Sequence, residues 1–345
     1  MSNSEVIRVV QAGATGPVAE AFRAIIAQPE VPLSLEAVAA STPAHIGKKL
    51  GEIAAAPPGL EDVPVISLDD AIHNTASRVV FSGLRNEEAA EYEDLLARGR
   101  VLATNAGVNR MRPDVALFNA YIKSPQLYEL SGVERPGYII ANGNCTSIFL
   151  SVALAPLRKA IGISRVEVET WQGWSGAGRG QVPEEYADQV IPIEGDEKEK
   201  IETEPRKFLS SMQELADIAI QATPKRGPWV TGHYERVRVE LARTTTTEEV
   251  NDIWRSFRSP RCLHGLPGKC MPARSPIQVL YEGRLLDYEG SVPKLGVQHP
   301  MKVQARVLEV DPEDGRKVEF EISGHNLILG AAGASIMNVL YLKRM

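Results

Sequence analysis

The segment from Val6 to Ile26 constrains the fold most strongly, because it is typical of a buried strand, a glycine-rich turn and an amphipathic helix in succession. The strand is Val6-Ile-Arg-Val-Val-Gln and the turn is Gly13-Ala-Thr-Gly-Pro-Val-Ala, in which Ala19 replaces the third glycine of the dinucleotide fingerprint. Glycines at such a turn let the N–H groups of the helix face a pyrophosphate. The segment therefore predicts a nucleotide-binding unit at the start of this sequence.

Further strand–helix units follow this turn. Val79–Leu84 precedes a helical pattern that begins at Asn86, and Val101–Asn105 is another strand, followed by a loop. Strands that alternate with helices indicate a parallel, doubly wound sheet of the Rossmann type. The first part of the chain is therefore expected to be α/β.

The end of the second predicted strand, Leu33 to Ala40, bears on the nucleotide. Ser41-Thr42 follows it, with no Asp or Glu to bind a ribose 2′-hydroxyl and repel a 2′-phosphate. Ser41, Lys48 and Lys49 offer donors for that phosphate. We therefore expect NADP as the cofactor, with NAD as the alternative.

From about Asn142 the pattern changes to alternating apolar and polar residues, as in Val166-Glu-Val-Glu-Thr-Trp-Gln. The same alternation occurs at Arg236–Leu241, Val303–Leu308 and Val318–Ile322. It is typical of half-solvated strands, so we expect an α+β domain with a mixed or antiparallel sheet. The outer strand faces are natural subunit interfaces, which favours a homodimer or a dimer of dimers.

The bulk composition excludes several classes of protein. A length of 345 residues favours two domains, and a net charge of −6 gives no reason to expect nucleic acid or anionic membrane as a partner. No apolar run is long enough to span a bilayer, and the first residues lack the features of a signal peptide, so the cytoplasm is the expected location. Three cysteines fit a reducing compartment, and Cys262, His264 and Cys270 lack the spacing of a metal knuckle, so no metal is expected.

Cys145 is the first candidate for chemistry. It lies in Ala141-Asn-Gly-Asn-Cys-Thr-Ser, between a strand-like segment that begins at Gly137 and a helical pattern that begins at Ser147. A thiol in the first turn of a helix feels the positive end of the helix dipole, which favours the thiolate.

Motifs spread over nearly the whole chain then point to one family. They are Gly13-Ala-Thr-Gly, Ala40-Ser41 with Gly47-Lys-Lys, Phe81-Ser-Gly-Leu, Asn105 with Asn109-Arg-Met-Arg-Pro-Asp, Asn144-Cys-Thr, Gln172 with Ser175-Gly-Ala-Gly, Val190-Ile-Pro-Ile with Glu197-Lys-Glu-Lys, Gly232-His, and Asn326 with Gly330-Ala-Ala-Gly. In this order they resemble the aspartate-β-semialdehyde dehydrogenase family, its archaeal and fungal-like branch in particular. The resemblance implies a Rossmann domain at 1–142 that the segment 326–345 completes as a Gly/Ala-rich helix, and a catalytic and dimerisation domain at 143–325.

The resemblance also implies roles for individual residues. Cys145 would be the nucleophile, His233 the acid–base with an ordinary pKa near the working pH, and Gln172 the residue that orients the substrate. The residues expected to bind substrate or phosphate are Arg226 for a carboxylate, Glu197 for an amino group, Lys200 and Arg110 for phosphate, and Asn144. The residues expected to bind the cofactor are Gly13, Thr15, Gly16, Pro17, Val18, Ser41, Ser82, Gly83, Ser175, Gly176, Asn326 and Gly330.

The implied reaction interconverts an acyl phosphate, best L-4-aspartyl phosphate, and its semialdehyde through a cysteine thioester. The alternatives are an acyl-CoA thioester reductase of the malonyl-CoA reductase type, a glutamyl-phosphate relative, an enzyme with a changed acyl substrate, and a relative that only binds nucleotide. The sequence departs from the family at Asn119-Ala-Tyr-Ile and Ala141-Asn-Gly-Asn-Cys. It also carries Trp171, Trp174 and Trp229 near the predicted site, which suggests a reshaped pocket.

Overall fold

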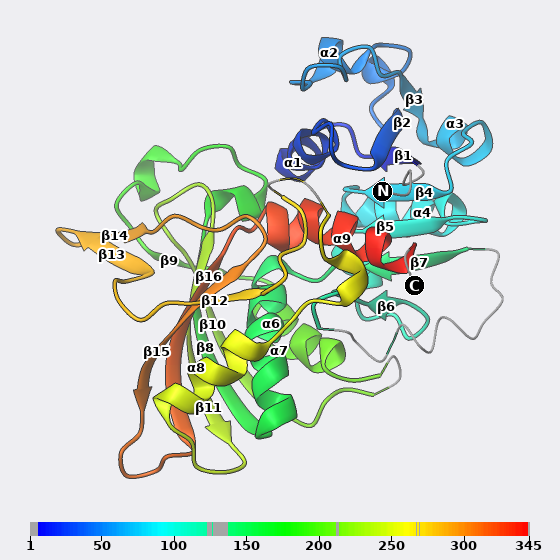
Figure 1. The fold of residues 1–345 in the computed structure, drawn as a ribbon. Helices are drawn as coiled ribbons and strands as arrows, with labels where there is room; N and C mark the ends of the chain where they lie inside the picture. Colours follow the sequence, from blue (N-terminus) through cyan, green and yellow to red (C-terminus); the bar gives the residue numbers. More distant parts are fainter. Residues whose placement is uncertain are drawn as a thin grey trace.

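The structure is a computed structural model that describes residues 6–122, 126, 137–211, 214–266, 268 and 270–343. Residues 1–5, which the argument against a signal peptide uses, lie outside the described residues. Two sheets lie side by side in the molecule, and the C-terminal helix runs between them (Figure 1). Within the described residues, no helix is long and apolar enough to cross a membrane.

The first sheet has seven strands in the order β3-β2-β1-β4-β5-β7-β6, and every strand pair is parallel. Its strands are β1 (Ile7–Ala12), β2 (Leu33–Ala40), β3 (Val65–Ser67), β4 (Val79–Ser82), β5 (Val101–Thr104), β6 (Ala116–Leu117) and β7 (Tyr138–Ala141). Its helices are α1 (Pro17–Ile26), α2 (Leu50–Ile53), α3 (Leu68–His73) and α4 (Asn86–Leu96), with short 3-10 turns at Pro43–His45 and Gly107–Asn109. The strand order reverses between β1 and β4, which is where such sheets bind ligands, and the predicted Rossmann architecture is confirmed.

The second sheet is mixed and has the order β12-β15-β16-β11-β8-β10-β9. Its strands are β8 (Ile163–Gln172), β9 (Ile191–Pro192), β10 (Ala219–Arg226), β11 (His233–Leu241), β12 (Ile277–Val279), β15 (Val303–Val310) and β16 (Lys317–Gly324). Helices α6 (Cys145–Ala160), α7 (Glu197–Phe208) and α8 (Thr247–Ser256) cover one face (Figure 1). The remaining elements are the hairpin β13 (Leu286–Glu289) and β14 (Val292–Leu295), and 3-10 turns at Trp174–Ala177, Glu184–Tyr186 and Arg261–Leu263. The predicted mixed sheet is confirmed.

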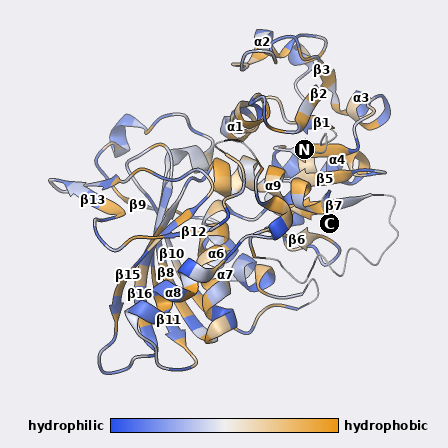
Figure 2. Ribbon diagram, in the orientation of Figure 1, coloured by the Kyte–Doolittle hydropathy of each residue, from blue (hydrophilic) through white to orange (hydrophobic). Residues whose placement is uncertain are grey.

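The C-terminal segment forms a π-helical turn at Ile328–Ala332 and continues as α9 (Gly333–Leu342). The sequence predicted a single Gly/Ala-rich helix here, and the wider first turn is the difference. Every residue of α9 from Gly333 to Tyr341 is buried, and Figure 2 shows α9 and the neighbouring strands as mostly hydrophobic. Burial on all sides explains why this helix lacks a polar face.

Asn338 connects α9 to the first sheet. Its Nδ2 donates a hydrogen bond of 2.8 Å to the carbonyl of Phe118, and its Oδ1 accepts one of 2.9 Å from the N–H of Ala120. Helix α9 thus contacts the nucleotide-binding half through Asn338. The exact domain boundaries at 142, 143, 325 and 326 stay a prediction.

We expect Asn338→Leu to destabilise the protein by about 2 kcal/mol, because it leaves a buried N–H and a buried C=O without partners. The free energy of unfolding from urea titration would measure this loss. Lys343→Ala, at the exposed end of the same helix, is the control and should change stability by less than about 0.5 kcal/mol. Equal stability of the two variants would contradict the role given to Asn338.

Candidate active site

Cys145 is the first residue of α6, directly after the turn that follows β7. The side chain of Asn144 caps this helix, because its Oδ1 accepts from the N–H of Thr146 at 2.9 Å and of Ser147 at 3.4 Å. Cys145 is partly exposed, whereas Asn144 and Thr146 are buried. The cap therefore fixes the backbone at the N-terminus of α6, where the thiol lies.

His233, the first residue of β11, faces this thiol. Its Nε2 lies 2.9 Å from the Sγ of Cys145, and its Nδ1 lies 2.8 Å from the carbonyl oxygen of Gly232. The N–H of Gly173 is 3.0 Å from that Nδ1 but also 3.0 Å from the same carbonyl. We assign the proton to Nδ1, which then donates to the Gly232 carbonyl and leaves Nε2 as the acceptor for the thiol proton.

Burial shifts the pKa values of both groups toward their neutral forms, which differs from two expectations from the sequence. Burial raises the pKa of the Cys145 thiol to about 12, and the nearby Glu197 raises it further. Burial lowers the pKa of His233 to about 3. The helix dipole favours the thiolate, but its effect is smaller than the cost of placing a charge in this interior.

One rung of the second sheet brings three predicted site residues together. Gln172 ends β8, and it is paired with Arg226 of β10 on one side and with His233 of β11 on the other. The Nη1 of Arg226 donates to the carbonyl of Gly173 at 2.9 Å. A guanidinium, an amide and an imidazole thus line the same end of the sheet, next to Cys145.

Helix α7 supplies the second wall of the site. Glu197 accepts from the Nε2 of Gln172 at 2.8 Å and from the Nδ2 of Asn144 at 2.9 Å, through the same oxygen. Lys200 lies one turn further and pairs with Asp196 at 2.7 Å. Glu197 therefore lies among the predicted catalytic groups, whereas the ammonium group of Lys200 is held by its own helix.

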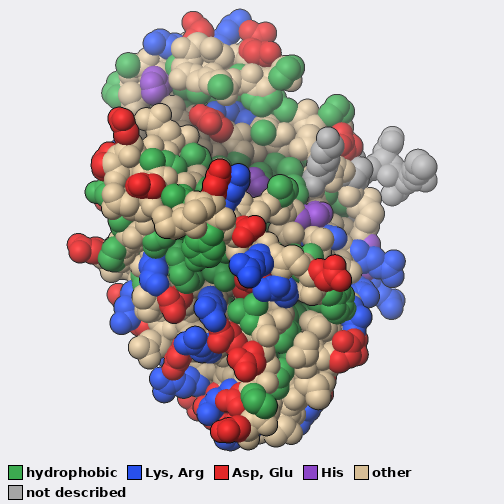
Figure 3. Space-filling view, turned by 90° about the vertical axis from the view of Figure 1, so that its left-hand side faces the viewer, with side chains coloured by type: hydrophobic (Ala, Val, Ile, Leu, Met, Phe, Trp, Pro, Cys, Tyr) green, Lys and Arg blue, Asp and Glu red, His purple; other side chains and the backbone are tan. Residues whose placement is uncertain are grey.

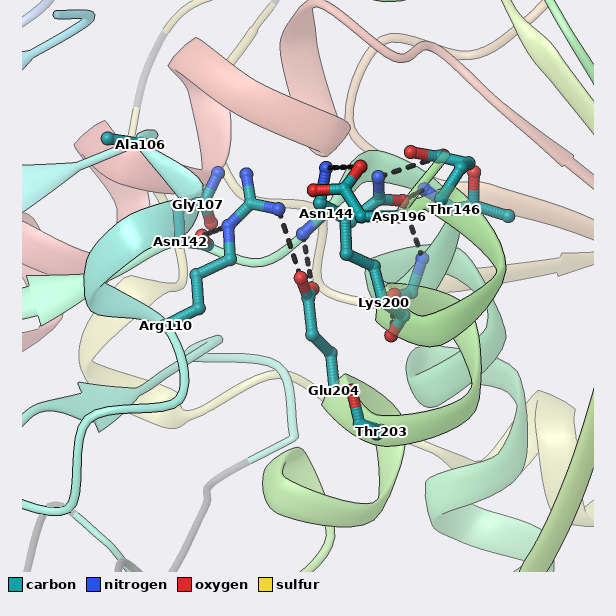
Figure 4. A network of polar contacts seen from close by, with 12 residues as sticks. Ala106, Gly107, Arg110, Asn142, Asn144, Thr146, Asp196, Lys200, Thr203 and Glu204 are labelled. Atoms are coloured by element: carbon teal, nitrogen blue, oxygen red, sulfur yellow. Dashed lines mark hydrogen bonds and ion pairs between the residues drawn. The ribbon is translucent and has the colours of Figure 1, made fainter. Parts of the chain in front are cut away.

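Glu204 connects the turn of the nucleophile to Arg110 (Figure 4). One carboxyl oxygen accepts from the backbone N–H of Asn144 at 2.6 Å, and the other accepts from the Nη1 of Arg110 at 3.0 Å. Arg110 also donates to the carbonyls of Asn142 and Asn105, at 3.0 and 2.8 Å. Each of the three guanidinium nitrogens of Arg110, the predicted phosphate-binding arginine, thus already donates one hydrogen bond within the protein.

Lys207 holds the loop that carries Arg110. It is 2% exposed, and its Nζ donates to the carbonyls of Arg110, Arg112 and Val115 at 2.7 to 3.0 Å. Burial lowers its pKa to about 8. Neither Glu204 nor Lys207 was predicted from the sequence, although the spacing of residues 197, 200, 204 and 207 places them on one helical face.

Residues predicted to bind the cofactor also lie at this thiol. A Cβ added to Gly330 would come within 2.6 Å of the Cβ of Cys145, and one added to Gly176 would come within 3.1 Å of the ring of His233. Asn326 accepts from the N–H of Gly232 at 2.8 Å and donates to the hydroxyl of Ser175 at 2.9 Å. The two glycines keep the space beside the thiol and the imidazole free of side chains.

Most of the other predicted cofactor residues lie around the first strand–helix turn. A cavity of about 320 Å³ opens beside this turn. Gly13, Thr15, Ser41 and Gly83 line this cavity, together with Ala14, Ala40, Thr42, His45, Arg85 and Glu88. Gly16 caps α1 at a φ of 99°, which only glycine adopts easily, and Pro17 and Val18 begin the helix. Ser82 is buried beside the cavity and does not line it.

The predicted phosphate donors coincide only in part with the residues that line this cavity. Lys49 pairs with Asp62 at 2.7 Å, and neither Lys48 nor Lys49 is among the lining residues. Arg85, which the sequence analysis did not single out, lines the cavity instead. A residue 44 positions beyond Ser41 reaches this place only because β2 and β4 flank β1 in the sheet.

One of the three tryptophans, Trp171, points away from the predicted site. Trp171 and Trp229 pack with Tyr234 under the hairpin of β13 and β14, since alternation along β8 points Trp171 to the face opposite Gln172. Trp174 does lie at the site, because its ring is 5.7 Å from the guanidinium carbon of Arg226. The prediction of three indoles near the site is therefore wrong for Trp171. Trp229 does reach it, because its Nε1 donates at 2.9 Å to the carbonyl of Gly232, which lies 2.8 Å from the Nδ1 of His233.

Among the described residues, no three His, Cys, Asp or Glu side chains lie close enough together to share a metal ion. The reactive groups that the fold assembles are instead a thiol, an imidazole, a guanidinium and a carboxylate. Together with a parallel nucleotide-binding sheet, they define an oxidoreductase that uses a nicotinamide dinucleotide.

Comparisons with known proteins give the family. Residues 8–129 match the semialdehyde dehydrogenase NAD binding domain, and residues 154–329 match the semialdehyde dehydrogenase dimerisation domain. The aspartate-semialdehyde dehydrogenases of Methanothermobacter thermautotrophicus and Archaeoglobus fulgidus are 31% and 32% identical over 94% of this chain and 96% and 95% of theirs. The chain belongs to the semialdehyde dehydrogenase family.

Solved structures agree with this fold. The aspartate semialdehyde dehydrogenase of Candida albicans with NADP covers 99% of both chains at a TM-score of 0.78 and 24% identity. Aspartate semialdehyde dehydrogenase II of Vibrio cholerae covers 99% of both chains at 0.76 and 22%. At these identities the likeness shows the fold alone.

We expect alkylation of Cys145 by iodoacetamide to speed up about tenfold per pH unit between about pH 7 and about pH 9, without a plateau. The reason is a thiol pKa of about 12, which keeps the thiolate fraction small and proportional to hydroxide. Peptide mass spectrometry would follow the reaction, and Cys145→Ser would report the background from Cys262 and Cys270. A plateau below about pH 8 would show a stable thiolate–imidazolium pair instead.

Proposed function

We propose that this protein is an NADP-dependent aspartate-semialdehyde dehydrogenase, which interconverts L-aspartate-4-semialdehyde and L-4-aspartyl phosphate. The observation that carries the proposal is the 2.9 Å contact of Cys145 with His233, beside Arg226, Gln172 and Glu197. Relatives that carry this name match 94% of the chain, and the Candida structure of that name contains NADP.

The residues of the site have distinct tasks in this reaction. Arg226 binds the substrate carboxylate with two parallel donors, and Glu197, held by Gln172 and Asn144, receives the amino group. This orientation places the aldehyde carbon at the Sγ of Cys145. Because a carboxylate and an ammonium are bound by opposite charges, the substrate has one favoured direction in the pocket.

Proton transfer between Cys145 and His233 accompanies each covalent step. The thiol gives its proton to Nε2 as sulfur bonds to the aldehyde carbon, and the resulting alkoxide takes that proton back. When hydride leaves the carbon, Nε2 removes the hydroxyl proton and a thioester remains. Bound nicotinamide supplies the acceptor for that hydride.

The thioester must then pass its acyl group to an acceptor. A phosphate oxygen attacks the carbonyl carbon, the sulfur leaves, and Cys145 recovers its proton from His233. Arg110 and Lys200 are the cations for this phosphate in our proposal. The bonds of Arg110 to Glu204, Asn142 and Asn105 leave it fewer free donors, which is the observation in favour of coenzyme A as the alternative acceptor.

The decisive assay is nicotinamide reduction with L-aspartate-4-semialdehyde, with either inorganic phosphate or coenzyme A as acceptor. We expect phosphate-dependent turnover in the wild type and none in Cys145→Ala, because the thioester needs the sulfur. The alanine variant should still bind NADPH, which tests that the nucleotide site is intact. Activity with coenzyme A alone would assign the protein to the thioester reductases.

We also infer a homodimer formed through the outer face of the second sheet. The family's dimerisation domain matches this half of the chain. The face carries pairs of opposite charges such as Arg238 with Glu319 at 3.0 Å and Lys225 with Glu169 at 2.6 Å. Figure 3 shows Lys, Arg, Asp and Glu interleaved over the lower part of this side of the molecule. A second copy related by a two-fold axis would present the same mixed charges to them.

Arg238→Glu should weaken the dimer at least about tenfold, since it places a like charge beside Glu319 in both copies. Sedimentation velocity over a range of protein concentrations would measure the change. Arg98→Glu, an equal charge change at an exposed turn of the first half, is the control. A dimer unaffected by Arg238→Glu would place the interface elsewhere.

The expected location is the cytoplasm, and the expected partners are small molecules. A count of only three cysteines is what a reducing compartment favours. The net charge of −6 gives no attraction to nucleic acid.

A further inference from the structure

An acidic side chain reaches the end of β2 from a distant part of the sequence. The hydroxyl of Ser41 donates a hydrogen bond of 2.6 Å to Oε1 of Glu88, 47 residues further along the chain. Glu88 lies in the first turn of α4, which begins directly after β4. The acidic residue that the sequence lacks after β2 is thus supplied by a neighbouring strand–helix connection.

Arg85 holds this carboxylate in place. Its Nη2 lies 3.0 Å from the same oxygen of Glu88, and its backbone N–H donates to the other oxygen at 3.3 Å. The Arg85 contact, helped by Ser41, lowers the pKa of Glu88, so the carboxylate is charged at neutral pH. The Glu88 side chain is 18% exposed and that of Arg85 is 80% exposed, so the carboxylate is fixed while the guanidinium can move.

Glu88 and Arg85 lie in the part of the cavity that adjoins the end of β2. The cavity joins the Gly13–Thr15 turn to Ser41, Arg85 and Glu88. In a sheet of this type the pyrophosphate lies on the glycine turn, and the adenosine ribose lies at the end of the second strand. The 2′ position of that ribose therefore falls next to Ser41, Arg85 and Glu88.

We propose that Glu88 and Arg85 set the choice between NADP and NAD, an inference that rests on the proposed function only in taking this cavity as the dinucleotide site. Glu88 accepts a hydrogen bond from the 2′-hydroxyl of NAD. The 2′-phosphate of NADP takes Arg85 and Ser41 as donors, and Glu88 must release both for it to bind. The carboxylate thus makes this protein bind NAD as well and lowers its preference for NADP.

The chemistry of the two ligands separates their effects. A 2′-phosphate gains from a guanidinium but is repelled by a carboxylate, and a 2′-hydroxyl gains from the carboxylate only. Replacing Glu88 by Gln keeps an acceptor for Ser41 and removes the charge. Replacing Arg85 by Ala removes the guanidinium that the phosphate needs, while the backbone N–H of residue 85 and the hydroxyl of Ser41 still hold the Glu88 carboxylate.

The test is the dissociation constant for NADPH and for NADH, from nucleotide fluorescence without any aldehyde present. We expect Glu88→Gln to bind NADPH about tenfold more tightly and NADH about threefold more weakly, and Arg85→Ala to lose about tenfold for NADPH alone. Glu87→Gln removes the same charge at an exposed neighbouring position and should change neither value.

The outcomes are distinct. A Glu88→Gln variant that shifts both nucleotides equally, or neither, would overturn the inference, as would a wild-type protein that binds neither nucleotide. A wild type that binds both nucleotides but turns over no semialdehyde would refute the proposed function and leave the role of Glu88 and Arg85 standing.

Discussion

The hydrogen bonds to the Glu204 carboxylate hold together three segments that are distant in the sequence. The carboxylate lies on α7, one oxygen binds the backbone N–H that precedes Cys145, and the other binds Arg110 from the first sheet. A buried carboxylate costs several kcal/mol unless its oxygens are paired, so neither partner can leave without a large loss of stability. Because Glu197 on the same helix contacts Asn144 and Gln172, the position of α7 determines where the thiol lies relative to the second sheet.

Burial at this junction sets the chemistry as well as the geometry. Burial raises the pKa of Cys145 and lowers the pKa of His233, so both shifts favour the uncharged forms. Glu235, two residues along β11, is fully buried with its pKa raised well above the ordinary value. A thiol kept neutral reacts slowly with stray electrophiles. In the proposed reaction, a bound aldehyde overcomes the cost of forming the thiolate, because the sulfur bonds to the carbonyl carbon while its proton moves to the imidazole. Under the proposed function, selectivity follows from the requirement that Arg226 and the Cys145 thiol engage the substrate together.

The sequence predicted the features that depend on local pattern. The strand–turn–helix at Gly13, the parallel sheet and the family follow from periodicity and ordered motifs, and each is confirmed. The roles of Cys145 and His233 stay predictions, although the structure brings the two together. The expected pKa values of Cys145 and His233 were wrong, because a pKa depends on how deeply the group is buried, which the sequence does not show. Glu88 and Glu204 were missed, because only the strand order and the helix packing bring them to their partners.

The position of Gly330 against Cys145 has a consequence for how the protein folds during its synthesis. The ribosome makes residues 326–342 after every strand of both sheets, yet this segment packs on the first sheet and closes over the thiol. The nascent chain can form its strand–helix units as they emerge, but the two halves must wait for the C-terminal segment to join them. Contacts between residues so far apart form late and slowly. The site around Cys145 is therefore complete only after the C-terminal segment has been synthesised and has packed against both halves.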